Sequence, residues 1–403
     1  MSMVAWRDEP DILAALRIAW SRRAPPLRLG VALLVPVVLL ASFVGCDNGP
    51  IDPDVHPRVI WKVDGTSASV QPAFDSDNVF FGSALHEVIA VDKTTGQVQW
   101  RRRTGATSQR TEGNNIVVAG DAVVMGDVDL YAFDRRTGNS RWTFAPPYAQ
   151  PGFYSSATDG TRIYAGSPEG LVFAIDAATG VMRWQAEVPG DTAITAAFSP
   201  TYSEGVVFVG VKTFGSPVAT GGLAAFRAAT GEMLWFRSFA PELSGQGSGS
   251  LGGAVFAGSL VIAASDDGRI YGIDRGNGEV RWIAPRVHPV PPYNDTRYLA
   301  VSGDRVIATS NHVIVVGLDA ATGVEVWKRS FSNMGSLYPP AVDNQALYVT
   351  GGGPLVSLRV ADGTTRWQLQ LTPRGDSWVT PVVDGDRLYV PELENGFYAL
   401  RAN

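Results

Sequence analysis

The chain has 403 residues, of which 33 are Lys or Arg and 39 are Asp or Glu, and its formal net charge is −6 at pH 7. Residues 1–46 hold five Arg and three acidic residues, so residues 47–403 carry 28 basic and 36 acidic side chains, a net of −8. This balance predicts a soluble, solvated surface and argues against nucleic acid as the main partner.

The first element in chain order resembles a secretion signal. An apolar run from Leu29 to Val44 follows the basic residues Arg22, Arg23 and Arg28. A basic region followed by an apolar region is typical of a signal peptide. We therefore interpret residues 1–45 as a signal peptide with a long n-region of about thirty residues.

Cys46, the single cysteine, follows this run directly and excludes a disulfide within the chain. The sequence Phe43-Val44-Gly45-Cys46 resembles a bacterial lipobox, in which the Cys is lipidated and becomes the mature N-terminus, with Phe43 in place of the usual Leu. The alternative is an uncleaved membrane anchor with an incidental Cys, for which the apolar run is short. Both interpretations place the rest of the chain outside the cytoplasm. Residues 46–57 are then the lipidated Cys and a polar, proline-containing tether.

Asp47, directly after this cysteine, resembles the inner-membrane retention signal of enterobacterial lipoproteins. We therefore expect a lipid-anchored protein on the extracytoplasmic face of the cell envelope. Asp47 favours the inner membrane over the outer one.

The rest of the chain repeats a unit of about forty residues that contains one tryptophan. The spacings between successive repeated tryptophans are 39, 42, 42, 51, 47, 45 and 40 residues. A fixed period of this length indicates a unit that buries its apolar face against its neighbours. The repeated residues are Trp61, Trp100, Trp142, Trp184, Trp235, Trp282, Trp327 and Trp367.

Seven of these tryptophans are the last residue of the pattern Ala-x-Asp-x-x-Thr-Gly-x-x-x-Trp. Some copies are complete, and the others carry substitutions. Short β-rich runs precede the Asp, and a second run leads from the Gly to the Trp. The Asp can bond the turn backbone and the Gly can take a positive φ, so the pattern predicts a hairpin. Arg227 and Arg359 replace the Asp in two copies. The motif carboxylates in the other five are Asp92, Asp134, Asp176, Asp274 and Asp319.

These repeats predict an all-β fold, an eight-bladed β-propeller of four-stranded blades over residues 58–403. The last residues are Phe397-Tyr398-Ala399-Leu400-Arg401-Ala402-Asn403, in which Ala399 and Arg401 fit the start of an eighth motif. The missing half stands at the other end as Val59-Ile60-Trp61-Lys62. We therefore expect the N- and C-terminal strands to pair in one blade and close the ring, which removes two exposed sheet edges.

The repeated motif resembles the pyrroloquinoline-quinone (PQQ)-type propeller repeat, often called the tryptophan-docking motif. The resemblance covers residues 58–403. Two families share the repeat: the quinoprotein alcohol dehydrogenases, and non-enzymatic propellers represented by the BamB family of outer-membrane assembly lipoproteins. Fold alone does not choose between them.

Resemblance to the enzymes implies PQQ held over two adjacent cysteines, a calcium ion held by carboxylates and a catalytic Asp. The chain has one cysteine, so we expect no cofactor. Its four histidines share no metal-ligand spacing, which predicts neither a metal site nor a catalytic residue. The repeated tryptophans could form a sugar-binding platform, but one aromatic residue per repeat beside a fixed turn is typical of packing between blades.

Binding residues are expected in the longer connections, since loops on a rigid scaffold usually carry them. The longest spacings locate extra sequence at 212–222 and 238–252, and a Pro-, Tyr- and Arg-containing connection spans 285–297. The alternative is that these connections are surface loops without a binding role. The candidate contact residues are Lys212, Phe214, His288, Tyr293, Arg297 and Trp378, the last of which lies outside the tryptophan period.

The sequence therefore predicts a monomeric, membrane-tethered, non-catalytic protein-binding scaffold. Resemblance to the BamB family implies a partner in the β-barrel assembly machinery and a role in outer-membrane protein assembly. A PQQ-dependent oxidoreductase and a propeller that binds an envelope polysaccharide are the alternatives.

Overall fold

The structure is a computed structural model in which the chain divides into two compact units, Met1–Asn48 and Gly49–Asn403. It describes residues 58–402 except 67, 69, 106–114, 147–151, 154, 191–193, 215–220, 240–252, 266–267, 288–295, 311, 371–378 and 394–395. Residues 194, 214, 296 and 297 are described by their backbone alone. The segments predicted as signal peptide, lipidated cysteine and tether lie outside the described residues.

The second unit is built from eight antiparallel sheets of four strands each. Strands that follow one another along the chain pair within a sheet, so each sheet is a meander. The first four blades are β2 Ala73–Phe74, β3 Asn78–Ser83, β4 Glu87–Asp92 and β5 Val98–Arg103; β6 Ile116–Ala119, β7 Ala122–Gly126, β8 Leu130–Asp134 and β9 Ser140–Phe144; β10 Ser156–Thr158, β11 Arg162–Gly166, β12 Leu171–Asp176 and β13 Met182–Glu187; and β14 Ile194–Ser203, β15 Val206–Phe214, β16 Gly221–Arg227 and β17 Met233–Phe239.

The remaining blades follow the same plan, except that the eighth takes its outermost strand from the start of the propeller. They are β18 Val255–Ala257, β19 Leu260–Ala264, β20 Ile270–Asp274 and β21 Val280–Ala284; β22 Thr296–Ser302, β23 Arg305–Ser310, β24 Ile314–Asp319 and β25 Glu325–Ser330; β26 Ala341–Val342, β27 Ala346–Val349, β28 Leu355–Arg359 and β29 Thr365–Leu369; and β30 Val382–Asp384, β31 Arg387–Glu392, β32 Gly396–Arg401 and β1 Val59–Val63.

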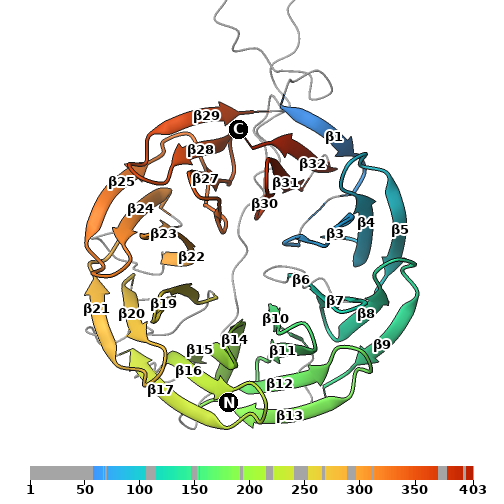
Figure 1. The fold of residues 1–403 in the computed structure, drawn as a ribbon, viewed down its shortest axis with the longest axis horizontal. Coiled ribbons are helices and arrows are strands. Elements are labelled where there is room, and N and C mark those ends of the chain that lie inside the picture. The colour runs from blue at the N-terminus through green and yellow to red at the C-terminus, as the bar shows by residue number, and fades with distance from the viewer. Residues whose placement is uncertain are drawn as a thin grey trace, which may run out of the picture. The chain divides into compact units, whose positions relative to one another are not determined.

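The eight sheets form a ring, with the first strand of each blade innermost and the fourth outermost (Figure 1). Strand β1 pairs with β32, where Trp61 lies opposite Ala399 and Val63 opposite Phe397. The predicted eight-bladed propeller and its closure by the two ends of the chain are therefore confirmed.

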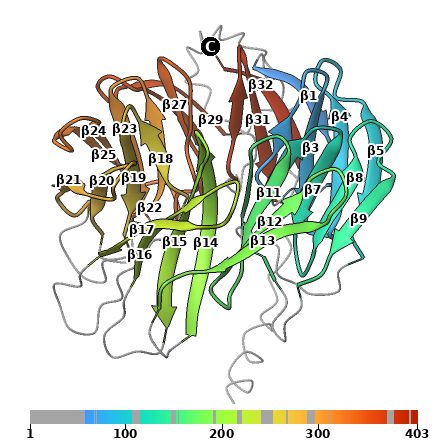
Figure 2. The same cartoon turned by 60° about the horizontal axis from the view of Figure 1, so that its bottom comes forward.

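The hydrophobic core lies between neighbouring blades. One buried cluster joins Val124 and Ala132 of the second blade to Ile163 and Phe173 of the third. Similar clusters repeat around the ring, and Figure 2 shows the sheets standing side by side. Each blade alone would expose both faces of its sheet, so the blades stabilise one another.

The motif forms the hairpin between the third and fourth strands of a blade. In the first blade the Asp92 carboxylate accepts hydrogen bonds from the backbone N–H of Thr95 at 2.7 Å and from its hydroxyl at 2.9 Å. The N–H of Gly96 donates to the Asp92 carbonyl at 2.9 Å, and its φ of 73° lies in the left-handed region. The turn chemistry predicted for this motif is thus present.

Candidate interaction face

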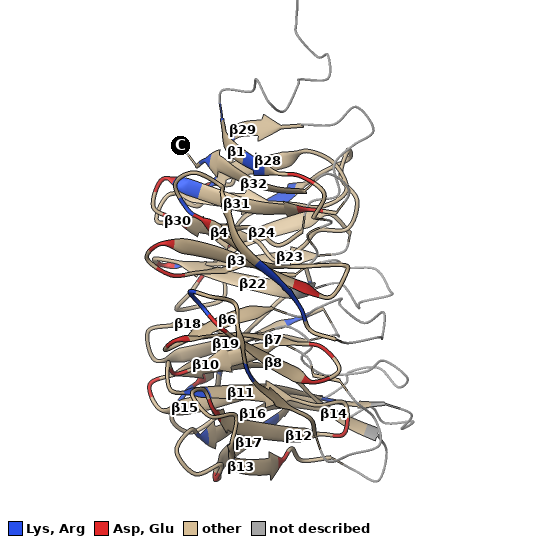
Figure 3. Cartoon of the chain, turned by 90° about the vertical axis from the view of Figure 1, so that its right-hand side faces the viewer, with Lys and Arg blue, Asp and Glu red and all other residues tan. Residues whose placement is uncertain are grey.

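The ring has two faces that differ in their connections. Because the four strands of a blade alternate in direction, the turns between strands one and two and between strands three and four share one face. We call this the turn face. The turns between strands two and three and the connections from one blade to the next share the opposite face, which we call the loop face (Figure 3).

The described strand ends that flank each of the predicted binding connections lie on the loop face. The segment 212–222 joins β15 to β16, the second to the third strand of the fourth blade. The segments 238–252 and 285–297 and the residue Trp378 belong to connections that lead from one blade to the next. Strand ends that are far apart in the sequence and flank these connections therefore share one face of the ring.

Individual candidate residues are placed less completely. Lys212 is half-buried on β15 and stands between Ala196 and Gly221 in the sheet. The Phe214 backbone pairs with Ile194 at the end of the same strand. Arg297 lies in β22 at a register shift. His288, Tyr293 and Trp378 lie outside the described residues.

Each repeated tryptophan except the last reaches into the following blade. Its ring lies over the motif glycine of that blade, and its indole N–H donates to the carbonyl of the residue after the motif Asp or its Arg substitute. A methyl group on Gly138, for example, would stand 2.6 Å from the Trp100 ring. The seven Nε1–carbonyl pairs are Trp61–Lys93 at 3.1 Å, Trp100–Arg135 at 3.0 Å, Trp142–Ala177 at 3.0 Å, Trp184–Ala228 at 2.9 Å, Trp235–Arg275 at 3.0 Å, Trp282–Ala320 at 3.2 Å and Trp327–Val360 at 2.9 Å.

The motif carboxylates are held ionised by the turns that they organise. Hydrogen bonds from Arg183 and Thr179 lower the pKa of Asp176 to about 2. Bonds from the threonine of the turn lower the pKa of Asp92 and Asp134, and those from Arg281 and the Gly276 N–H lower that of Asp274. The pKa of Asp319 is lowered by Thr322. The contacts of these residues are intramolecular.

The two blades with Arg in place of Asp keep the same backbone turn. The Gly231 N–H donates to the Arg227 carbonyl at 2.8 Å, while the Arg227 side chain pairs with Glu232 at 2.9 Å. In the seventh blade Asp362 accepts from the N–H of Thr364 at 2.9 Å instead. The substituted turns are therefore stabilised by other side chains.

A cationic residue directly after the motif Asp makes a second contact between blades, which sequence analysis missed. Arg135 approaches Asp75 of the preceding blade at 3.6 Å, and Arg275 approaches Glu204 of the preceding blade at 3.1 Å. Lys93 pairs in the same way with Asp384. The signal that could have revealed these pairs is a cation after the motif in three repeats and an acidic turn one repeat earlier.

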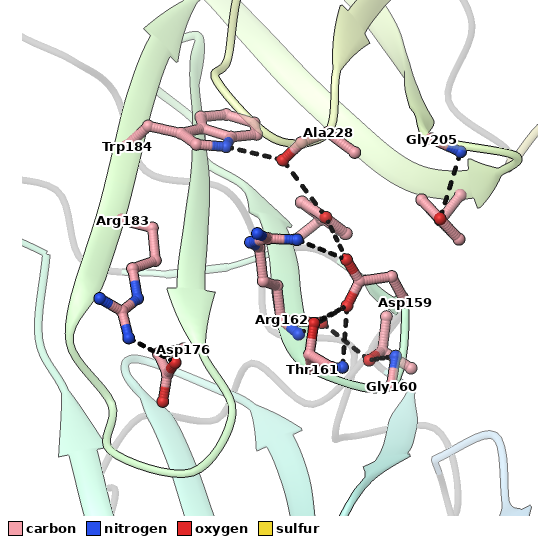
Figure 4. A network of polar contacts seen from close by, with 12 residues as sticks. Asp159, Gly160, Thr161, Arg162, Asp176, Arg183, Trp184, Gly205 and Ala228 are labelled. Atoms are coloured by element: carbon pink, nitrogen blue, oxygen red, sulfur yellow. Dashed lines mark hydrogen bonds and ion pairs between the residues drawn. The ribbon is translucent and has the colours of Figure 1, made fainter.

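The third and fourth blades use a tyrosine instead, as Figure 4 shows around Asp159 and Ala228. The Tyr164 hydroxyl contacts the Asp159 carboxylate at 2.8 Å and the Ala228 carbonyl at 3.4 Å. Burial opposes ionisation of Asp159, but hydrogen bonds from Tyr164 and Thr161 outweigh it and lower the pKa of the carboxyl to about 2. The Trp184 indole donates to the same Ala228 carbonyl.

On the loop face a histidine and a carboxylate join the first two blades. His86 Nδ1 lies 2.6 Å from a carboxylate oxygen of Asp127, whose side chain is fully buried. His86 adopts a φ of 58°, and its carbonyl accepts from the Thr104 N–H at 2.9 Å. Across the part of the chain that the structure describes, His, Cys, Asp and Glu form no group of three that could hold a metal ion.

A protein-family model described as "Outer membrane protein assembly factor BamB" matches residues 55–151, 125–312 and 311–403. Together these matches span the propeller from end to end. The chain belongs to the BamB family. Within the described residues, no helix has the length and apolar character needed to cross a membrane.

Proteins named outer membrane protein assembly factor BamB are similar along most of the chain. The one from Yersinia pestis is 24% identical over 91% of this chain and 88% of its own length. The one from Burkholderia pseudomallei is 22% identical over 87% and 89%. A quinohemoprotein alcohol dehydrogenase from Comamonas testosteroni is 28% identical, but over 38% of this chain and 23% of its own.

Solved structures show the same fold. The crystal structure of BamB from Moraxella catarrhalis has a TM-score of 0.67 at 19% identity and covers 85% of this chain and 100% of its own. Quinohemoprotein alcohol dehydrogenase from Comamonas testosteroni has a TM-score of 0.64 at 14% identity, with 85% and 76% covered. The fold is therefore common to the BamB family and to the enzymes, as the repeat predicts.

Proposed function

We propose that this protein is a membrane-tethered, non-catalytic binding scaffold of the bacterial envelope that assists the assembly of outer-membrane β-barrel proteins. Its lipid anchor is Cys46, residues 46–57 form the tether, and residues 58–403 are a monomeric propeller on the extracytoplasmic side. Its partner belongs to the β-barrel assembly machinery.

The observation that carries this proposal is the family match over the whole propeller, together with relatives named as outer membrane protein assembly factors. The topology supports the mechanism. The described ends of the longer connections share the loop face of a ring whose blades are joined by repeated indole–carbonyl hydrogen bonds. A rigid ring holds several loops in fixed positions, so a partner can bind them together without ordering the scaffold.

The residues present do not fit the PQQ group of the related enzymes. The single cysteine of the chain precedes the propeller, so the blades supply no adjacent cysteine pair. The buried Asp127 carboxylate contacts His86 and the Val128 N–H. The alternative functions are binding of a quinone and binding of an envelope glycan, and the test below includes both.

The test is crosslinking of the lipoprotein in its native membranes, followed by mass spectrometry of what is captured. Two variants replace residues 215–220 or 288–295 with short glycine-containing turns. The matched control carries Arg136→Ala and Arg227→Ala, both at exposed positions of the turn face.

Capture of a β-barrel assembly protein by the wild type and the control, lost in the loop variants, is the expected result. Capture of no assembly component, with the protein confined to inner-membrane fractions, would refute the proposal. Quinone absorbance and glycan binding would then be measured on the purified protein.

A further inference from the structure

Positive charge is concentrated on the outside of the ring. The whole chain has 33 basic and 39 acidic residues, of which five and six lie in residues 1–57, so residues 58–403 hold 28 and 33. The eight outermost strands hold eleven basic residues against two acidic ones, Glu187 and Glu325. The basic residues are Lys62, Arg101, Arg102, Arg103, Arg141, Arg183, Arg237, Arg281, Lys328, Arg329 and Arg366.

Several of these cations serve the turns of their own blades. The Arg that precedes the motif tryptophan pairs with the motif Asp in three blades: Arg141 with Asp134 at 3.3 Å, Arg183 with Asp176 at 2.7 Å and Arg281 with Asp274 at 2.9 Å. These guanidinium groups are neutralised where they stand, so they do not attract a partner.

Strand β5 departs from this arrangement. Gln99 precedes its tryptophan, and three consecutive arginines, Arg101, Arg102 and Arg103, follow it on the outer edge of the first blade. Among the described residues one carboxylate, that of Glu87, approaches them, at 3.9 Å from Arg101 and 3.5 Å from Arg103. The Arg103 side chain remains 74% exposed.

The immediate surroundings of this arginine edge include an exposed apolar side chain. Glu87 pairs with Arg103 in the sheet, and Leu85 lies two residues before Glu87 in the adjoining turn. Leu85 is 56% exposed. A cationic surface with an apolar side chain beside it suits the interface of an anionic bilayer, where phosphates meet guanidinium groups and apolar side chains enter the acyl boundary.

The edge belongs to the blade that adjoins the one where the proposed tether joins the propeller. Trp61 of β1 covers Gly96, the turn residue that leads into β5, so the outermost strands of the eighth and first blades are neighbours. Eleven residues, 47–57, separate Cys46 from Arg58. A lipid on Cys46 would hold the start of β1 within roughly 40 Å of the bilayer surface.

We propose that the edge formed by Arg101, Arg102, Arg103 and Leu85 contacts the anionic surface of the membrane to which the chain is tethered. The inference rests on the lipid anchor of the proposed function and adds to it a preferred orientation, with the first blade toward the bilayer. Three arginines also block strand pairing at an open sheet edge. Blocking strand pairing needs no bilayer, and the experiment distinguishes this role from membrane contact.

The test uses the full lipidated protein in vesicles of phosphatidylcholine, with or without phosphatidylglycerol. Cys46 is the single cysteine, and its thiol is consumed by the lipid, so an introduced cysteine is the one thiol that a fluorophore can label. Gln99→Cys places this label on β5 of the first blade, and Gln185→Cys places it on β13 of the third blade. A quencher fixed to the lipid headgroups then reports the distance of each label from the bilayer, while flotation reports anchoring.

We expect phosphatidylglycerol to raise quenching at position 99 but not at position 185, and raised salt to reverse the effect. Arg102→Gln with Arg103→Gln should abolish the rise, since Arg101 keeps its contact with Glu87. Lys328→Gln with Arg329→Gln removes the same charge from β25 and should leave the rise intact.

Flotation with unchanged quenching at position 99 would overturn this inference and leave the anchor standing. Equal quenching at both positions would overturn it as well. Failure of the protein to float with either vesicle would overturn the anchor and this inference together.

Discussion

The guanidinium carbon of Arg58 lies 4.3 Å from the centre of the Trp367 ring. In the seven other interfaces between blades the tryptophan ring faces a motif glycine. At this interface no hairpin joins β32 to β1, because the two strands come from opposite ends of the propeller. Within the described part of the chain Trp367 Nε1 has no hydrogen-bond partner. A cation that directly precedes the first strand therefore packs on the tryptophan that lacks the usual turn.

Removal of Arg58 should weaken this interface. Arg58 also bonds the Arg401 carbonyl, so Arg58→Ala loses a cation–π contact and a peripheral hydrogen bond. We expect the free energy of unfolding to fall by about 1–2 kcal/mol. Urea unfolding followed by tryptophan fluorescence measures the change, and Arg329→Ala on an exposed outer strand is the control. Equal losses in the two variants would contradict this role of Arg58.

Gly138→Ala should disrupt docking of Trp100. The new methyl group would stand 2.6 Å from the ring, and φ at this position is 70°. Gly258→Ala is the matched control, since its φ is 56° but nothing lies within 4 Å of the added methyl group. Both variants bear about 1–2 kcal/mol of backbone strain, and the clash should add about 1–3 kcal/mol at Gly138. Thermal and urea unfolding of the two variants should differ by that amount.

Asp159 should make the stability of the propeller sensitive to acid. Its folded-state pKa of about 2 lies below the ordinary value of 3.8, so its stabilising contribution is present above about pH 4 and is lost as pH falls toward 2. Between about pH 4 and pH 2 the free energy of unfolding should therefore decrease by about 1–2 kcal/mol less in Asp159→Asn than in the wild type. Asp304→Asn, at a largely exposed carboxyl in the equivalent turn of the sixth blade, is the matched control for the loss of a carboxylate. A parallel fall in wild type and Asp159→Asn would contradict the assignment.

Cys46→Ser distinguishes a lipid anchor from an uncleaved apolar anchor. Since the thiol is the attachment point of the lipid, we expect the variant to lack the lipidated, processed N-terminus that mass spectrometry should find in the wild type. Membrane fractionation would then show whether Asp47→Ser moves the lipidated protein from inner to outer membrane. An unprocessed wild type of full mass, identical in behaviour to Cys46→Ser, would refute lipidation.

The periodic features of the fold were predictable because the residues that specify them recur in every repeat. The spacing of Trp100, Trp142 and Trp184 predicts the number of blades, and the Asp and Gly of each motif predict the hairpin that the structure contains. The halves of a motif at Trp61 and Ala399 predict the closing blade. Contacts that occur in a few blades, such as Arg135–Asp75 and Tyr164–Ala228, were not predicted, since the two residues of each pair stand in different repeats and meet only when the blades pack.

The sequence by itself determined the eight blades, their turns and the closure of the ring, because each depends on local turn chemistry and on an apolar period that neighbouring repeats must bury. The tertiary structure decided which side chains meet across a blade interface. It stacks Arg58 on Trp367, joins His86 to Asp127 and places Arg135 against Asp75 of the preceding blade. These pairings depend on the position of one blade against the next, and that position follows from packing in three dimensions.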